Sequence, residues 1–212
     1  MATAIEIPPA LQADDRFAIR HLDWSAYESI RRALENHPVR LAYDGKDLEL
    51  MSPSPIHESY SNLFGRLLSA LALERDIEMR GGRSMTFRRD DVQRGLEPDD
   101  CYWIQNEPAV RGKPEIDLSV DPPPDLAIEI DITRSSIDRL AIYAKLRVPE
   151  VWLFIGESLR IHRLQANGGY LEEEESRCLP VLDIQKMVPF LQLDIEVGET
   201  TRVRQFIQSI RG

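Results

Sequence analysis

The sequence predicts an α/β protein in which a central mixed β-sheet is flanked by helices and extended by hairpins. Short apolar strands alternate with amphipathic helices along the chain, and Asp44-Gly45-Lys46 and Asn167-Gly168-Gly169 are typical hairpin turns. A chain of 212 residues with 42% hydrophobic composition can bury a full core as one unit. We therefore expect a flexible lead-in over residues 1–20 and a single domain over residues 21–212.

In the N-terminal half, two helices alternate with short strands. Asp23 is a suitable N-cap for the first helix, and Pro53 and Pro55 precede the second, longer one, whose leucines share one side. The expected elements are a helix over Trp24–Glu35, hairpin strands over Val39–Tyr43 and Asp47–Met51, a helix over Ile56–Arg75, and strands over Ile77–Met79, Ser84–Arg88 and Asp99–Ile104.

The C-terminal half continues the alternation. Ser135 can cap a helix that runs through Leu146, with Asp138 at the third helical position. The expected elements are a strand over Asp125–Ile132, this helix, a buried strand over Val151–Ile155, hairpin strands over Leu159–Leu164 and Tyr170–Glu174, and a closing helix over Thr200–Ile210.

The strand over Asp125–Ile132 is the most informative segment, because acids interrupt an otherwise apolar run. Side chains alternate between the faces of a strand, so Glu129 shares a face with Asp125, Ala127 and Asp131. Carboxylates two residues apart on one face lie roughly 7 Å apart. Burying like charges together is costly, so such a face indicates a bound metal, a shared proton or a water-filled cleft. The first hypothesis is a metal site on a central strand.

Charge and composition limit the function classes. A formal net charge of −10 argues against broad coating of nucleic acid, although five arginines between residues 80 and 94 could form a local basic patch. The apolar stretches are too short and too often interrupted for a membrane protein, and no secretory signal is recognisable at the N-terminus. Cys101 and Cys178 have no metal-binding spacing and suggest no disulfide framework. The cytoplasm is the expected location.

Several motifs in order carry a resemblance to a known family. They are Met51-Ser52-Pro53, His57-Glu58, Pro98-Asp99, the segment Pro124-Asp125-Leu126-Ala127-Ile128-Glu129, Tyr143-Ala144 and the segment Val148-Pro149-Glu150-Val151-Trp152-Leu153. In this order and spacing the chain resembles the bacterial putative restriction endonuclease family of the PD-(D/E)XK nuclease superfamily, over roughly residues 20 to 190. The resemblance implies a restriction-endonuclease-like core, hydrolysis of DNA phosphodiester bonds and a homodimer.

The resemblance also implies a site. It makes Asp99 and Glu129 metal-binding acids, adds Glu58 as a further acid, and gives the main-chain carbonyl of Ile130 as an extra ligand. Such a set of oxygen ligands suits Mg²⁺ or Mn²⁺. The superfamily places Lys two residues after the second acid, where this chain has Asp131. Related proteins carry a basic residue four positions before the Tyr, which here is Arg139.

Other interpretations stay open at this stage. Asp131 could form a structural ion pair with Arg139, and His57 is expected to be a lone surface histidine. Tyr143 and Trp152 are expected to belong to the core, and Lys145 to be solvated. Two other functions compete with the nuclease: a catalytically degenerate nuclease fold that binds nucleic acid or protein, and a glycoside hydrolase with a metal-free carboxylate pair.

Overall fold

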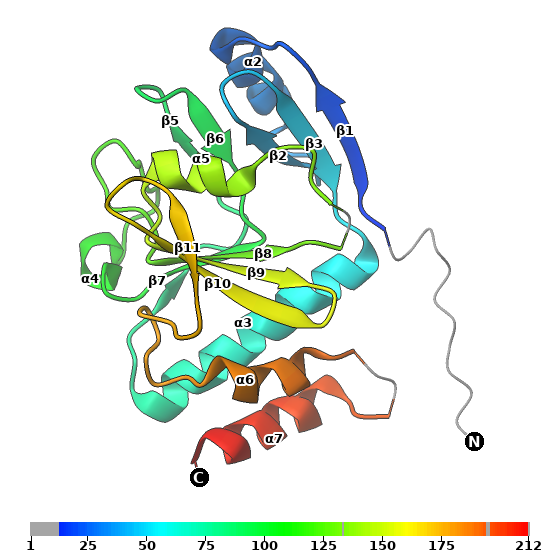
Figure 1. The fold of residues 1–212 in the computed structure, drawn as a ribbon, viewed down its shortest axis with the longest axis vertical. Helices are drawn as coiled ribbons and strands as arrows, with labels where there is room; N and C mark the ends of the chain where they lie inside the picture. The colour runs from blue at the N-terminus through cyan, green and yellow to red at the C-terminus, as the bar shows by residue number, and fades with distance from the viewer. Residues whose placement is uncertain (1–12, 133, 194–195, 212) are drawn as a thin grey trace.

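Two β-sheets form the framework of the computed structural model, which describes residues 13–132, 134–193 and 196–211 (Figure 1). The first sheet is antiparallel, in the order β1 (Asp15–Ile19), β3 (Leu48–Ser52), β2 (Arg40–Tyr43), β6 (Arg94–Leu96), β5 (Phe87–Arg89). The second sheet has the order β11 (Tyr170–Glu173), β10 (Ser158–Leu164), β9 (Glu150–Ile155), β8 (Leu126–Ile130), β7 (Asp100–Trp103), β4 (Arg80–Gly81). Only β8 and β9 pair in parallel among these strands, so the second sheet is mixed.

Helices cover both faces of the second sheet. The helices are α2 (Trp24–Leu34), α3 (Pro55–Arg75), α4 (Glu107–Val110), α5 (Arg139–Leu146), α6 (Ile184–Met187) and α7 (Glu199–Arg211), with a 3-10 turn η1 (Val188–Leu191). Figure 1 shows α3 along one face of the sheet with α7 beside it, and α5 on the opposite face, toward the first sheet. The predicted class, a mixed central sheet flanked by helices with added hairpins, is therefore confirmed.

Strand β8 separates two hydrophobic cores. Leu126, Ile128 and Ile130 pack with the leucines of α3, whereas Ala127 packs with Ile142 of α5. The predicted alternation of faces is thus confirmed, and Glu129 lies on the α5 side. A carboxylate in that position is enclosed by the sheet and a helix, where burial makes its charge costly unless it is paired.

The structure corrects the N-terminal boundary. Asp15–Ile19, inside the lead-in predicted over residues 1–20, form β1 and pair antiparallel with β3. This edge strand is only partly buried, so its apolar pattern is weak. Residues 1–12 lie outside the described part of the chain, and the single domain over residues 21–212 stays a prediction.

Other boundaries differ for local reasons. The strand expected at Ile77–Met79 lies instead at Arg80–Gly81, while Ile77 and Met79 pack against the core. Helix α5 begins at Arg139, because the Asp138 carboxylate, and not Ser135, accepts the cap hydrogen bond from the Ala141 amide at 3.1 Å. Strand β6 was absent from the expected elements, since Arg94–Leu96 contains a glycine and an arginine.

Cys101 and Cys178 are both free and buried. Within the described ranges, no helix is both long and apolar enough to cross a bilayer.

Candidate active site

The two predicted acids meet where the chain passes from the first sheet to the second. Glu97-Pro98-Asp99 connects β6 to β7, and β7 pairs antiparallel with β8. Asp100 is opposite Ile128, so one further step of the register places Asp99 opposite Glu129. The Asp99 amide also donates to the Ile128 carbonyl at 3.2 Å. Two carboxylates therefore face each other across neighbouring strands, both with side chains almost fully buried.

Asp99 is surrounded by hydrogen-bond donors. Its Oδ2 accepts from the Ile130 amide at 2.6 Å, and its Oδ1 accepts from Arg40 Nη1 and lies 3.0 Å from His57 Nε2. Burial alone would raise the pKa of Asp99, but the hydrogen bond to His57 and the charges of His57, Arg40 and Arg139 lower it below its usual value. Asp99 is consequently held ionised.

His57 links Asp99 to the N-terminal segment, which corrects the expectation of a lone surface histidine. The side chain is fully buried on the first turn of α3, and its Nδ1 lies 3.2 Å from Asp14 Oδ2. Burial would lower the pKa of His57, but its hydrogen bonds to Asp14 and Asp99 and their charges raise it to about 9. The imidazolium then donates from both nitrogens, one to each carboxylate.

This arrangement predicts a loss of stability in mild alkali. The pKa of His57 rises from 6.5 to about 9 on folding, so its contribution is fully present below pH 6.5 and is lost as pH rises through 9. A shift of this size corresponds to roughly 3 kcal/mol at most. Urea unfolding at pH 6, 7.5 and 9 should show the decline, and His57→Gln should flatten it. A free energy of unfolding that stays constant over this range in the wild-type protein would contradict the buried imidazolium.

Glu129 is held by a different set of donors. Arg139 Nη2 donates to Glu129 Oε1 at 2.8 Å, Arg139 Nε lies 2.8 Å from Oε2, and the Tyr143 hydroxyl donates to Oε1. Burial raises the pKa of Glu129, the charge of Arg139 opposes this, and repulsion from Asp99 adds to the rise. Two neighbouring acids with pKa values moved in opposite directions are typical of functional sites.

The other predicted site residues lie around this pair. Glu58 on α3 is about half exposed and binds Arg40 Nη2 at 2.7 Å, so Arg40 stands between Glu58 and Asp99. Ile130 adjoins the pair because its backbone amide donates a hydrogen bond to Asp99. Asp131 is not paired with Arg139, as one hypothesis had it; its nearest cation is Arg16, at 3.9 Å.

Residues expected to be structural fall as predicted, with one addition. Trp152 and Tyr143 are fully buried core residues, and Lys145 is exposed. Tyr143, however, also contacts Glu129 through its hydroxyl. A core tyrosine therefore takes part in fixing the rotamer of a candidate site acid.

Glu49 on β3 is a site residue that the sequence did not reveal. Its buried carboxylate accepts from Arg16 Nη1 at 2.7 Å, from the Ser135 hydroxyl at 2.8 Å, and from the amide and hydroxyl of Ser136 at 2.7 and 2.8 Å. Burial would raise the pKa of Glu49, but these hydrogen bonds and Arg16 lower it. Glu49 thereby ties β1 and the segment before α5 to the first sheet. Its place in an alternating strand gave no signal of this role.

The carboxylate oxygens around the pair are of the type that binds divalent cations, although the described residues form no complete metal site. No group of three or more His, Cys, Asp or Glu within them is arranged to hold a metal ion. Carboxylates nevertheless outnumber bases around the pair. The acids are Asp14, Glu49, Glu58, Glu97, Asp99, Glu129 and Asp131, and the bases are Arg16, Arg40, His57 and Arg139. A hard cation would find oxygen ligands and an excess of negative charge here, in competition with arginine.

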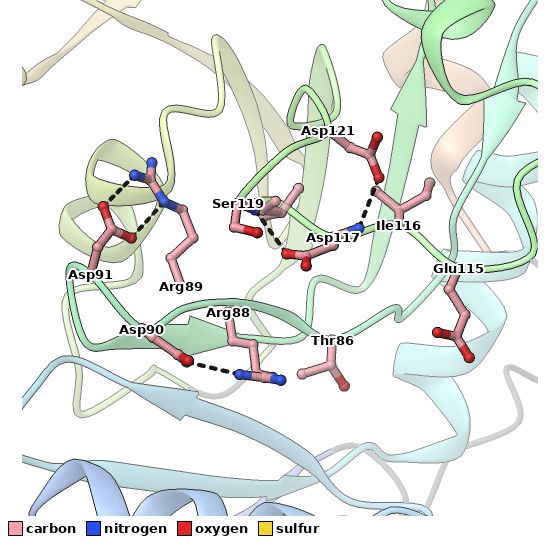
Figure 2. A pocket seen from close by; sticks show the side chains of 11 residues that line it. Thr86, Arg88, Arg89, Asp90, Asp91, Glu115, Ile116, Asp117, Ser119 and Asp121 are labelled. Atoms are coloured by element: carbon pink, nitrogen blue, oxygen red, sulfur yellow. Dashed lines mark hydrogen bonds and ion pairs between the residues drawn. The ribbon is translucent and has the colours of Figure 1, made fainter.

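One cavity opens onto Glu129, and a second lies beside the neighbours of Asp99. One of about 440 Å³ is lined by Glu129, Ile130 and Arg139, and another of about 440 Å³ by Arg40, Glu58 and Glu97. A third cavity, of about 640 Å³, lies away from the pair, between β5 and residues 115–121 (Figure 2). Of these three cavities, the first is lined by Glu129 itself, and the second by Arg40 and Glu58, which adjoin Asp99.

Comparison with family models agrees with the resemblance drawn from the motifs. A family model described as "Uma2: Putative restriction endonuclease" matches residues 24–196. A crystal structure of a putative nuclease belonging to DUF820 from Anabaena variabilis ATCC 29413 has 12% sequence identity and a TM-score of 0.49, over 87% of this chain and 99% of that one. No curated protein matches the chain.

Proposed function

The chain belongs to the Uma2 putative restriction endonuclease family, and on this premise we propose that it is a metal-dependent endonuclease that hydrolyses DNA phosphodiester bonds. The observation that carries the proposal is the placement of Asp99 opposite Glu129, with Arg139 directed at Glu129 and a cavity beside them. Family membership also favours a nuclease over the glycoside hydrolase considered from the sequence.

In this proposal, Asp99, Glu129, the Ile130 carbonyl and Glu58 would hold Mg²⁺ or Mn²⁺. The bound cation would polarise the scissile phosphate and lower the pKa of the attacking water. Arg139 contributes a permanent positive charge beside the reacting phosphate. Because a guanidinium does not lose its proton at neutral pH, Arg139 stabilises charge and does not act as a general base.

Asp131 stands where the superfamily has lysine, so the proposal assigns the positive charge to α5 rather than β8. Arg139 reaches Glu129 from the first turn of α5, and its Nη2 also donates to the Glu97 carbonyl at 2.7 Å. These contacts fix the guanidinium between β8, which carries Glu129, and the β6–β7 connection, which carries Asp99. A fixed charge costs little reorganisation during reaction, which supports a catalytic role.

The proposal includes a homodimer in the cytoplasm. The dimer is inferred by analogy with the fold, and light scattering of the purified chain would measure its mass. Cys101 and Cys178 are both free and buried, as is usual in reducing compartments.

Metal dependence provides the test of this function. With millimolar Mg²⁺ or Mn²⁺, the purified chain is expected to nick or linearise plasmid DNA, and the metal is expected to raise the melting temperature by mass action. Asp99→Asn should abolish both effects, because it removes one carboxylate charge while keeping the side-chain shape. Plasmid gels and thermal unfolding scans measure the two outcomes separately.

A surface acid supplies the matched control. Glu157→Gln changes an exposed acid on the β9–β10 turn and should leave cleavage and the metal response intact. Absence of cleavage on plasmid, linear and single-stranded DNA, together with no metal response, would refute the enzyme.

A degenerate fold that binds DNA without cleaving it is the second candidate. The observation that favours it is that Asp99 already has partners: its two carboxylate oxygens accept hydrogen bonds from Arg40, His57 and the Ile130 amide. If those contacts persist in solution with metal present, Asp99 cannot ligate a cation. DNA binding that is independent of divalent metal, without any product, would support this candidate.

A further inference from the structure

We propose that the cavity beside Glu129 is a phosphate subsite, in which Arg134 contacts the backbone phosphate next to the scissile one. The inference rests on the proposed function, since it assigns the subsite to a DNA strand lying across the acid pair. The cavity, of about 440 Å³, is lined by Glu129 and Ile130 of β8, by Arg16 of β1, and by residues 134–140. It is therefore continuous with the residues that would carry out hydrolysis.

Arginines line this cavity from three parts of the chain. Arg16 comes from the edge strand of the first sheet, Arg134 from the segment after β8, and Arg139 from the first turn of α5. Arg16 Nε is buried without a hydrogen-bond acceptor in the described structure, whereas Arg139 Nε lies against Glu129. Donors that border a cavity without an acceptor match the oxygen-rich surface of a phosphodiester.

Arg134 differs from its neighbours in having no acidic partner. Arg16 is paired with Glu49 and Arg139 with Glu129, whereas the exposed Arg134 makes no ion pair or hydrogen bond with any described residue. Of the acids nearby, Asp138 caps α5, and Asp131 lies 3.9 Å from Arg16 without accepting a hydrogen bond at its buried Oδ1. An arginine without an acidic partner at the edge of this cavity provides a local positive charge for an anion.

The cavity in Figure 2 shows the opposite arrangement. Its two arginines are neutralised by acids two residues away, since Arg88 binds Asp90 at 2.9 Å and Arg89 binds Asp91 through both Nε and Nη2. Further carboxylates line its other side. The basic patch suggested by the sequence between residues 80 and 94 is therefore balanced at this cavity, and phosphate is better placed beside Arg134.

The segment that carries Arg134 is fixed before any ligand arrives. Ser135 and Ser136, the next two residues, are bound by the buried carboxylate of Glu49 through both hydroxyls and one amide. Anchoring the segment reduces the conformational entropy lost when Arg134 takes up a phosphate. Arg134 itself is exposed, so a DNA strand can reach it.

The test compares Arg134→Ala with Arg204→Ala, which removes an exposed arginine of α7 that pairs with no residue in the described part of the chain and lies far from α5 in Figure 1. Binding of a fluorescent DNA duplex is measured in EDTA over a range of salt concentrations. Arg134→Ala should weaken binding several-fold and reduce the slope of log K against log salt by about 1, as expected for the loss of one phosphate contact. Arg204→Ala should change neither quantity, and both variants should keep the metal-induced thermal shift.

The outcomes separate the subsite from the proposed hydrolysis. If neither the wild-type protein nor any variant cleaves DNA but binding still depends on Arg134, the proposed hydrolysis is refuted and the phosphate subsite is supported. Equal binding by Arg134→Ala and Arg204→Ala would overturn the subsite. Thermal shifts with inorganic phosphate form the third arm: stabilisation that depends on Arg134, without any duplex binding, would overturn the assignment to a nucleic-acid backbone.

Discussion

Replacing Arg139 by alanine is expected to lower metal-dependent DNA cleavage by about a hundred- to a thousand-fold, the usual cost of removing one preorganised charge from a transition state. The guanidinium contacts Glu129 on one side and the Glu97 carbonyl on the other, so its position is fixed relative to both strands of the acid pair. Arg139→Lys should keep part of the rate, because the charge remains although the second hydrogen bond is lost. Initial cleavage rates under saturating metal provide the measurement.

The same substitution also affects stability, and the two effects must be separated. Arg139 and Glu129 form a buried pair, and removing one partner of such a pair typically costs about 3–5 kcal/mol. The double variant Glu129→Gln/Arg139→Met removes both charges and should be more stable than Arg139→Ala, although equally inactive. Rates are compared at a temperature where circular dichroism shows each variant folded. A folded Arg139→Ala protein with an unchanged rate would exclude a catalytic role for this arginine.

The acidic strand explains why part of the site could be predicted. Side chains alternate along any strand, so Glu129 had to share a face with Ala127 and point to the other face from Ile128. An acid on the α5 side of a buried strand has few structural explanations. The pattern that reveals it lies within one short segment of the sequence. The placement of Asp99 opposite Glu129 was expected only from the resemblance, since it depends on how β7 pairs with β8.

The partners of these acids could not be predicted, because they are distant in sequence. Arg40 reaches Asp99 across 59 positions, and Ser135 reaches Glu49 across 86. Neither contact has a local signature: Arg40 begins a short strand, and Glu49 occupies an ordinary position in another. His57 was misjudged for the same reason, since only the tertiary structure brings Asp14 and Asp99 to its two ring nitrogens.

The crowding of cations at Asp99 bears on how the proposed metal would bind. Arg40 Nη1 and His57 Nε2 both approach Asp99 Oδ1, and these two nitrogens lie 3.0 Å apart. Two positive charges at this distance repel each other, so the binding of one of them to Asp99 is weakened. Arg40 also contacts Glu58, which is half exposed and lines a cavity. Of the two cations, Arg40 is therefore the one that can move away from Asp99 into open space.

Arg40→Met is consequently expected to destabilise the metal-free protein by about 3–5 kcal/mol, because Asp99 loses the arginine of a buried ion pair. At the same time, the variant should show a larger metal-induced rise in melting temperature than the wild-type protein. The reason is competition: in the wild-type protein a cation must replace Arg40 at Asp99, whereas in the variant that oxygen is already free of the guanidinium. Thermal unfolding with and without millimolar Mg²⁺ or Mn²⁺ measures both changes.

Arg163→Met is the matched control, since Arg163 pairs with Glu173 between β10 and β11, away from Asp99. It removes a partly buried arginine from an ion pair and should lower stability without changing the metal response. If Arg40→Met and Arg163→Met respond equally to metal, Arg40 does not compete with a cation for Asp99. Its contacts would then be permanent, Asp99 would serve to hold β2, α3 and β8 together, and the binding module would become the better description of the chain.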